Sequence, residues 1–383
     1  MGQGGGADDA DPQGISRADS AGRADSAGRA GRADSAGRAD SAGRAGRREP
    51  RIQLPFDLRF AAFGVAEARA AGLSKSRLRN SAEARPFRGV RVPQPMPESQ
   101  TAEASTGVRG ASDEFAALAA RMQELDRSYW PVMSPNQAFG GVSAARLYGL
   151  PLPLKLLADA LVHVIVPKGR NPPRAKGVTA RSIPPRFWSI GRLGGLPVAS
   201  PELTYCLLAR HLDELELVQV GDALISDADN YPGRTWPQAL TTRDRLASAV
   251  EAWTGCAGAA VLRSATLRIR ERVESPWEST TRIALVDSGY PEPDINVPLM
   301  SGARQVARID LVDREARIGY DYEGDGHRTS QRQWRLDITR SREIESVGMR
   351  HVRLTVADLV PAGGLQAFTD YAKRLRAERL GRG

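Results

Sequence analysis

The chain has 383 residues, of which 41% are hydrophobic, and its 54 Lys and Arg against 45 Asp and Glu give a net charge of +9. This length suits two or three domains rather than one. No stretch approaches the roughly 18 to 20 uncharged apolar residues that cross a bilayer, which excludes a membrane-spanning protein. The two cysteines, Cys206 and Cys256, lie 50 residues apart, which excludes a disulfide framework and a multi-thiolate zinc site.

The first fifty residues are a low-complexity repeat. Residues 17–46 are two copies of RADSAGRADSAGRAG, with no aliphatic residue larger than Ala. Such a segment cannot bury enough apolar surface to offset its ordering entropy, so we expect residues 1–50 to be disordered. Residues 1–48 hold eight Arg and seven Asp, which gives a nucleic-acid-binding tail little support. No basic segment followed by an apolar run opens the chain, so we expect no secretory signal and a cytoplasmic protein.

The positive charge is concentrated in residues 51–93. This segment of 43 residues carries nine basic and three acidic side chains, a net charge of +6. A local excess of this kind is the electrostatic footprint of a nucleic-acid-binding protein. The segment therefore predicts double-stranded DNA as a partner, with a basic helical hairpin that contacts another protein as the alternative.

Residues 65–79 have the pattern of a helix-turn-helix. Ala68 lies four residues before Gly72, and Leu78 lies six residues after it. A small residue lets two helices cross closely, glycine permits the turn, and the late apolar residue fixes the second helix to the core. We expect Ser74 to cap the second helix and residues 90–92 to form a wing strand. The candidate DNA-contacting side chains are Lys75, Arg77, Arg79, Arg88 and Arg91.

A polar linker is expected at 94–113 and a mixed α/β scaffold at 114–258, with a strand before Pro167 and a helix that Pro201 opens. The segments 71–79, 86–91 and 140–153 resemble the N-terminal winged helix and the middle portion of AbiE-type antitoxin-like proteins. The resemblance implies DNA binding, and a toxin partner or a homodimer. Two polar residues of the scaffold have simple structural interpretations: His163 as a core or edge histidine and Asp222 as a buried carboxylate without a visible partner.

Residues 259–383 predict a compact α/β module. Its expected elements are helices at 259–272 and 276–288, strands near 294–299, 305–312 and 317–323, a helix at 330–347, a strand at 350–355 and a final helix. A hairpin centred on Glu315 would bring Asp310 opposite Tyr320, one residue from Asp321. Alternation places Asp321 and Glu323 on one face of the second strand. Crowded carboxylates need cations, so we expect Asp310, Asp321 and Glu323 to bind a hard divalent metal.

The region 274–359 resembles the very-short-patch-repair-like branch of the PD-(D/E)XK nuclease superfamily. The resemblance rests on the segments 274–278, 289–293 and 324–328, on the strand with Asp310, and on Asp337 followed by Arg340. It implies a restriction-endonuclease-like α/β domain that uses Mg²⁺ or Mn²⁺. Carried over to this sequence, the catalytic residues would be Asp310, Asp321, Glu323, Glu278 and His327, the last positioning or deprotonating the attacking water.

The site departs from the family at two positions. Asp321 stands where the family usually has Glu, and Glu323 stands where it has Lys or, in this branch, Asp. Each change moves a ligand by about one methylene, which implies reduced activity. Three of these assignments have a purely structural alternative. Glu278 could form a capping box with Ser275, residues 324–326 could be only a tight turn, and Asp337 with Arg340 could be a surface pair.

Two functions follow from these patterns. The sequence favours a DNA-binding protein with a metal-dependent endonuclease domain, a hydrolase of phosphodiester bonds. The alternative is an antitoxin-type transcriptional regulator whose nuclease-like domain is non-catalytic.

Overall fold

The structure is a computed structural model, and it describes residues 61–79, 83–93, 111–228, 231, 233–234, 236–323 and 331–381. The side chains of 111, 112 and 331–337 are not among the described ones. The chain divides into two compact units, residues 1–51 and 52–383, and every described residue belongs to the second. The repeat at 1–50 and most of the expected linker at 94–113 therefore lie outside the described residues. Within the described part, no helix is long and apolar enough to cross a membrane.

Residues 61–79 and 83–93 form two short helices and a two-stranded ribbon. Their elements are β1 (Phe63–Gly64), α1 (Val65–Ala70), α2 (Lys75–Arg79) and β2 (Val90–Arg91), and β1 pairs with β2 in antiparallel fashion. Ala68 and Leu78 are buried in one small core, and Gly72 has a φ of 91° between the helices. Ser74 Oγ accepts a hydrogen bond from the backbone N of Arg77 at 3.2 Å. The predicted positions of these four residues are confirmed.

The middle region is built on a five-stranded mixed sheet. The strand order is β5 (Val178–Ile183), β4 (Val162–Pro167), β3 (Ala138–Phe139), β7 (Leu196–Ala199) and β6 (Ile190–Leu193). The pairs β4–β5 and β3–β7 are parallel, whereas β3–β4 and β6–β7 are antiparallel. The apolar run of β4 is buried because helices cover the sheet.

Seven helices and two 3₁₀ turns complete the described middle region: α3 (Ala111–Tyr129), η2 (Trp130–Val132), α4 (Gly141–Tyr148), α5 (Leu154–Leu157), η3 (Pro185–Phe187), α6 (Pro201–Leu208), α7 (Glu214–Ile225), α8 (Arg243–Ala252) and α9 (Ala259–Arg268). Ser200 caps α6, and Pro201 occupies its first turn. Leu262 and Ala265 of α9 are fully buried in the same core as α7 and α8. This core places α9 with the middle region, so the C-terminal domain begins at α10.

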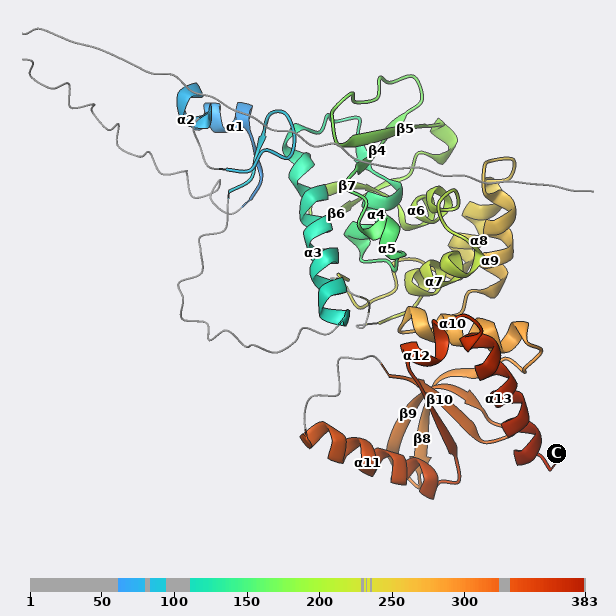
Figure 1. The fold of residues 1–383 in the computed structure, drawn as a ribbon. Helices are drawn as coiled ribbons and strands as arrows, with labels where there is room; N and C mark the ends of the chain where they lie inside the picture. Colours follow the sequence, from blue (N-terminus) through green and yellow to red (C-terminus); the bar gives the residue numbers. More distant parts are fainter. Residues whose placement is uncertain are drawn as a thin grey trace, which may run out of the picture. The chain divides into compact units, whose positions relative to one another are not determined.

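The C-terminal domain is a four-stranded mixed sheet with helices on both faces (Figure 1). In chain order it comprises α10 (Pro276–Asp287), β8 (Asp294–Ser301), β9 (Arg304–Asp313), β10 (Ile318–Tyr322), α11 (Gln331–Ser346), β11 (Arg350–Leu354), α12 (Val356–Leu359) and α13 (Gly364–Arg379). The strand order is β11-β10-β9-β8, and β10–β11 is the parallel pair because α11 connects them. Ile344 of α11 packs on one face and Phe368 of α13 on the other. The strands and helices expected here are confirmed.

The hairpin register differs from the expected one by one residue. Tyr320 was expected opposite Asp310 but pairs with Leu311, the last pair of this ladder. Extended by one residue, this register brings Asp310 to Asp321, and the Asp310 backbone N donates to Asp321 Oδ1. The cause is the turn: Asp313 Oδ1 accepts a hydrogen bond from the Ala316 backbone N at 3.0 Å, and Arg317 adopts a φ of 54°. These two features close the connection between Asp313 and Ile318.

A buried ion pair joins the middle region to the C-terminal domain. Asp222 of α7 is 0% exposed, and its Oδ2 lies 3.0 Å from an Arg282 nitrogen on α10. The same carboxylate accepts hydrogen bonds from Ser279 Oγ at 2.7 Å and from the Arg270 backbone N at 2.6 Å. The partner that the sequence did not reveal is thus 60 residues away along the chain.

Candidate functional site

Glu278 lies at the start of α10 and points toward the sheet. Ser275 caps the helix by accepting a hydrogen bond from the Glu278 backbone N at 3.2 Å. Oε2 of Glu278 accepts hydrogen bonds from the Glu274 backbone N at 3.0 Å and from Asn296 Nδ2 at 2.9 Å. The expected cap is present, but the Glu278 carboxylate is turned to β8 instead of to the Ser275 backbone amide.

Polar residues stand in a row across three strands. The pairs Ile295–Leu311 and Val297–Ile309 flank Asn296 and Asp310, so these two residues lie opposite each other on β8 and β9. The Asp310 backbone N donates to Asp321 Oδ1 at 2.9 Å. The structure therefore brings Asn296, Asp310 and Asp321 together, with Glu278 attached to the row through Asn296.

Burial and mutual repulsion disturb two of these carboxyl groups. Burial, followed by the charge of Asp310, raises the pKa of Glu278 from 4.5 to about 8. Burial, followed by the charge of Asp321, raises the pKa of Asp310 from 3.8 to about 7. The hydrogen bond from the Tyr322 backbone N to Asp310 Oδ2 at 3.0 Å acts in the opposite direction on the pKa of Asp310. Close, buried carboxyls of this kind favour a cation between them.

Protein side chains already pair with Asp321 and Glu323, the other two predicted metal ligands. Asp321 Oδ2 lies 2.6 Å from an Arg340 nitrogen of α11 and 2.9 Å from His351 Nε2 of β11. Glu323 is paired with Arg353. Arg340 thus bonds Asp321. Asp337 was the predicted surface partner of Arg340, and its side chain is not among those that the structure describes. His327 and the turn at 324–326 also lie outside the described residues.

The expected metal set of Asp310, Asp321 and Glu323 does not surround one position. In the described part of the chain, no three side chains among His, Cys, Asp and Glu are arranged to hold a metal ion. Asn296 adds an oxygen donor to this region. Oδ1 of Asn296, a side chain only 4% exposed, is buried without a hydrogen-bond partner among the described residues. The Asn296 amide bonds Glu278 through Nδ2 and stands opposite Asp310 in the sheet. Amide and carboxylate oxygens are the hard donors that Mg²⁺ and Mn²⁺ prefer.

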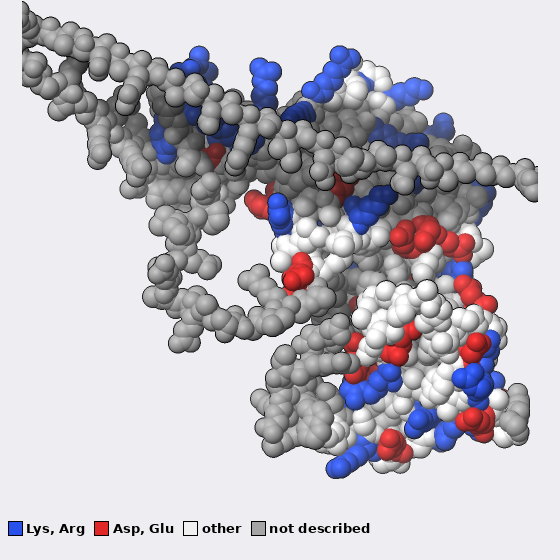
Figure 2. All heavy atoms as spheres, viewed as in Figure 1, with Lys and Arg blue, Asp and Glu red and all other residues white. Residues whose placement is uncertain are grey.

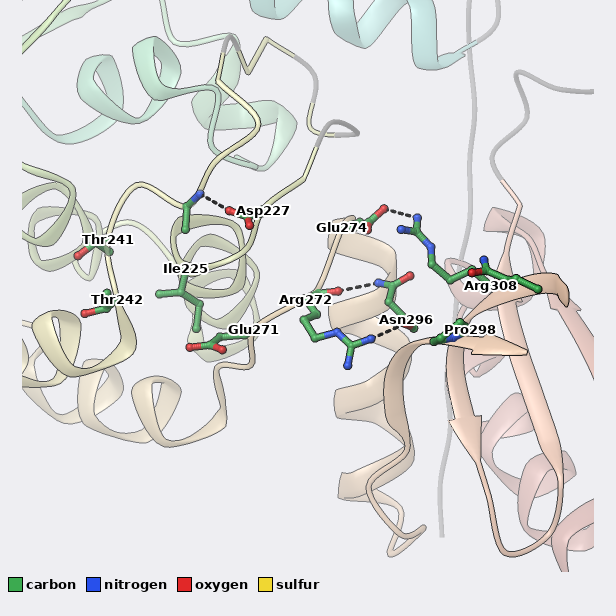
Figure 3. A pocket seen from close by; sticks show the side chains of 12 residues that line it. Ile225, Asp227, Thr241, Thr242, Glu271, Arg272, Glu274, Asn296, Pro298 and Arg308 are labelled. Carbon is green, nitrogen blue, oxygen red and sulfur yellow. Dashed lines mark hydrogen bonds and ion pairs between the residues drawn. The ribbon is translucent and has the colours of Figure 1, made fainter. Parts of the chain in front are cut away.

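A cleft of about 610 Å³ opens beside this row (Figure 3). Its lining includes Arg272 and Glu274 of the segment before α10, and Asn296 and Arg308 of the sheet. Arg272 donates to the backbone oxygen of Asn296 at 2.6 Å, and Arg308 lies 2.6 Å from a Glu274 oxygen. Figure 3 shows these side chains across from Thr241 and Thr242 of the middle region. The cleft combines guanidinium, hydroxyl and carboxylate groups at one edge of the carboxylate row.

The predicted DNA-contacting residues differ in their exposure. Lys75, Arg79 and Arg88 are exposed. Arg77 is half-buried and lies 3.6 Å from Glu83. Arg91 donates to the Leu78 carbonyl oxygen through Nε and Nη2, both at 3.1 Å, and so fastens the end of α2 to β2. In Figure 2, Lys and Arg side chains surround α1 and α2.

Sequence reasoning missed Asn296 and His351. Asn296 could have been suspected because an amide interrupts the strand Asp294–Ser301, and its φ of 49° is one that Asn tolerates better than most residues. His351 is opposite Gly319 in the parallel register of β10 and β11, and that pairing spans 32 residues. Local patterns carry no information on such a pairing.

The comparisons with known proteins add a distant relationship. No known family matches the chain, and no solved structure matches it. Two proteins of Mycobacterium tuberculosis, Uncharacterized protein MT2308 of strain CDC 1551 / Oshkosh and Uncharacterized protein Rv2248 of strain H37Rv, are each 22% identical to it over 217 residues. The similarity covers 57% of this chain and 73% of each relative.

Proposed function

We propose that the chain is a DNA-binding protein whose C-terminal domain hydrolyses phosphodiester bonds with Mg²⁺ or Mn²⁺. The observation that carries this proposal is the buried Oδ1 of Asn296, which lacks a partner in the described structure, next to Glu278 and Asp310. A buried polar atom without a partner costs about 1–3 kcal/mol, and a bound cation would remove this cost. The resemblance to very-short-patch-repair-like nucleases supports the same function.

The residues of the site have distinct proposed roles. Glu278, Asp310 and Asn296 would hold the cation. When bound, it would supply polarisation of the scissile phosphate and stabilise the developing negative charge. Arg308 has a side chain 49% exposed at the cleft, where its guanidinium can bind a phosphate oxygen. Arg340 and His351 hold Asp321, which in turn accepts the Asp310 backbone amide and fixes β9 against β10.

The proposed DNA-binding element is a winged helix at 51–93, of which residues 61–79 and 83–93 are described. Ala68 of α1 and Leu78 of α2 share one small core, Gly72 lies in the turn between the helices, and the ribbon of β1 and β2 would supply the wing. Lys75, Arg79 and Arg88 are its exposed cations. They would neutralise DNA phosphates, and the similarity to AbiE-type antitoxin-like proteins points to the same role.

A cleavage assay tests the proposed activity. The full chain is incubated with supercoiled plasmid in Mg²⁺ or Mn²⁺ beside Asp310→Asn and a control, Glu251→Gln, which changes an exposed carboxylate of α8. We expect the wild type and Glu251→Gln to nick the plasmid, and Asp310→Asn to lose at least about a hundredfold in rate. Equal cleavage by Asp310→Asn would refute the assignment of the site.

The second candidate function is a transcriptional regulator with a non-catalytic C-terminal domain. The observation that favours it is that Asp321 is already bonded by Arg340 and His351, and Glu323 is already paired with Arg353. Binding without cleavage, weakened by Lys75→Ala with Arg79→Ala and steeply dependent on salt, would establish the regulator. The exposed Arg263→Ala on α9 is the matched control.

A further inference from the structure

The middle region carries a strong segregation of charge. Residues 161–201 contain seven basic side chains and no Asp or Glu. Summed over 94–267 the net charge is only +1, so acidic residues elsewhere hide this excess. The segment forms β4, β5, β6 and β7. Figure 2 shows Lys and Arg side chains over the part of the surface where Figure 1 places β4 and β5.

A pocket of about 320 Å³ lies within this basic region. The parallel register pairs His163 with Thr179 and Ile165 with Arg181, so these side chains project from one face of the sheet. Arg210 and His211 follow the last residue of α6 and line the same pocket. The His163 and His211 rings lie 6.2 Å apart at 84°.

The cations of the pocket act on one another. Burial, followed by the charge of Arg210, lowers the pKa of Arg181, which is half-buried over the Trp253 ring at 5.9 Å. Burial, followed by the charges of His163, Arg210 and Arg181, lowers the pKa of His211. Asp159 acts in the opposite direction on His211, but its carboxylate already bonds His163 Nε2 at 3.0 Å and the Leu161 backbone N at 3.0 Å.

We propose that this pocket binds a phosphate group between Arg181 and Arg210, with His163 and His211 at its side. Two guanidinium groups with no carboxylate between them repel each other until an anion is bound, and their planar donors match phosphate oxygens. The pocket volume of about 320 Å³ leaves space for the group that carries the phosphate. The site lies on other elements than the proposed nuclease site, so each can fail without the other.

Thermal unfolding of the full chain tests the proposal in EDTA, where no divalent cation contributes. Sodium phosphate is compared with sodium chloride at equal ionic strength. We expect phosphate to raise the Tm of the wild type and of the control Arg263→Ala, which changes an exposed arginine outside the pocket. Arg210→Ala, also at an exposed position, and Arg181→Met, which keeps an apolar contact with Trp253, should each weaken phosphate binding by about tenfold or more. An equal phosphate effect in Arg210→Ala and wild type, or none beyond chloride, overturns the proposal.

Two further ligands identify the source of the phosphate. The affinities for a deoxynucleoside monophosphate and for a short DNA duplex are measured with the wild type and Arg210→Ala. A tenfold weaker affinity of Arg210→Ala for the duplex assigns the pocket to a nucleic-acid backbone. A loss of this size is expected when about one charge-assisted hydrogen bond is removed. A loss confined to the monophosphate assigns it to a free phosphate monoester. No loss with either ligand refutes the site.

Discussion

Asn296 Nδ2 donates to Oε2 of Glu278 at 2.9 Å and thereby ties β8 to the first turn of α10. The other donor bond of this amide goes to the Arg272 carbonyl oxygen at 2.6 Å, and its oxygen is left without a partner in the described structure. Asn296 is thus the point at which the segment before α10, the helix and the sheet meet. Because Asn296 lies in the row with Asp310 and Asp321, this contact fixes where Glu278 lies relative to those two carboxylates.

The stability of the metal-free protein should fall as the pH rises. The pKa of Glu278 is raised from 4.5 to about 8 and that of Asp310 from 3.8 to about 7, so the folded chain retains protons that the unfolded chain loses. The loss of stability begins near pH 4 and is complete near pH 8, with a size on the order of a few kcal/mol. Urea denaturation in EDTA across this pH range measures the effect.

Glu278→Gln is the variant that isolates one of these two groups. A glutamine amide oxygen at this position can still accept hydrogen bonds from Asn296 Nδ2 and from the Glu274 backbone N. The amide does not titrate, so the proton uptake of Glu278 is removed. We expect a shallower pH dependence and greater stability than the wild type at pH 8. An unchanged slope would show that Glu278 is not a source of the pH dependence.

Asp321 should matter more for stability than Glu323. Asp321 is 4% exposed and holds Arg340, His351 and the Asp310 backbone N, whereas Glu323 and Arg353 form a more exposed pair. Asp321→Asn should cost about 2–4 kcal/mol, and Glu323→Gln less than about 1 kcal/mol. Free energies of unfolding from urea titrations compare the two, and equal losses would contradict the structure.

The buried pair of Asp222 and Arg282 should show strong coupling. Arg282→Met leaves a carboxylate buried without its main cation and should cost about 3–5 kcal/mol. The double change Asp222→Leu with Arg282→Met removes both charges and should recover part of this loss. A double-mutant cycle measures the coupling, and additive losses would mean that the two side chains do not interact.

Gly149 is fixed by both its backbone angle and its neighbours. It ends α4 at a φ of 68°, and a Cβ there would overlap the Arg234 backbone. Gly149→Ala should lower stability by at least about 3 kcal/mol. Gly169, at a φ of 92° with open space around it, is the control, and its change to Ala should cost about 1 kcal/mol. Equal shifts in Tm would exclude the steric overlap as the cause.

The sequence predicted what depends on neighbouring residues. Helical spacing, Pro201 and the cap at Ser275 located their elements. The burial of Ala68 and Leu78 and the turn at Gly72 followed from spacing alone. The hairpin register was wrong by one residue because a hydrogen bond from Ala316 to Asp313 and the positive φ of Arg317 set it. The mixed α/β character of the chain was confirmed.

Contacts between distant residues could not be predicted. The Asp222–Arg282 pair spans 60 residues, the Asp321–His351 pair 30, and the Glu278–Asn296 bond 18. Hydrophobic periodicity carries no information about which polar side chains meet across elements. The sequence of residues 161–201 contains seven basic and no acidic side chains. This local excess was missed because the net charge of the larger region, residues 94–267, is only +1.

The central claim is that Glu278, Asp310 and Asn296 hold one divalent cation. Mn²⁺ binding to the full chain, measured by electron paramagnetic resonance of the free ion, tests it directly. We expect one bound Mn²⁺ in the wild type and in Glu251→Gln, and an affinity at least about tenfold weaker in Asp310→Asn. Undiminished binding by Asp310→Asn, or no binding by the wild type, would contradict the claim.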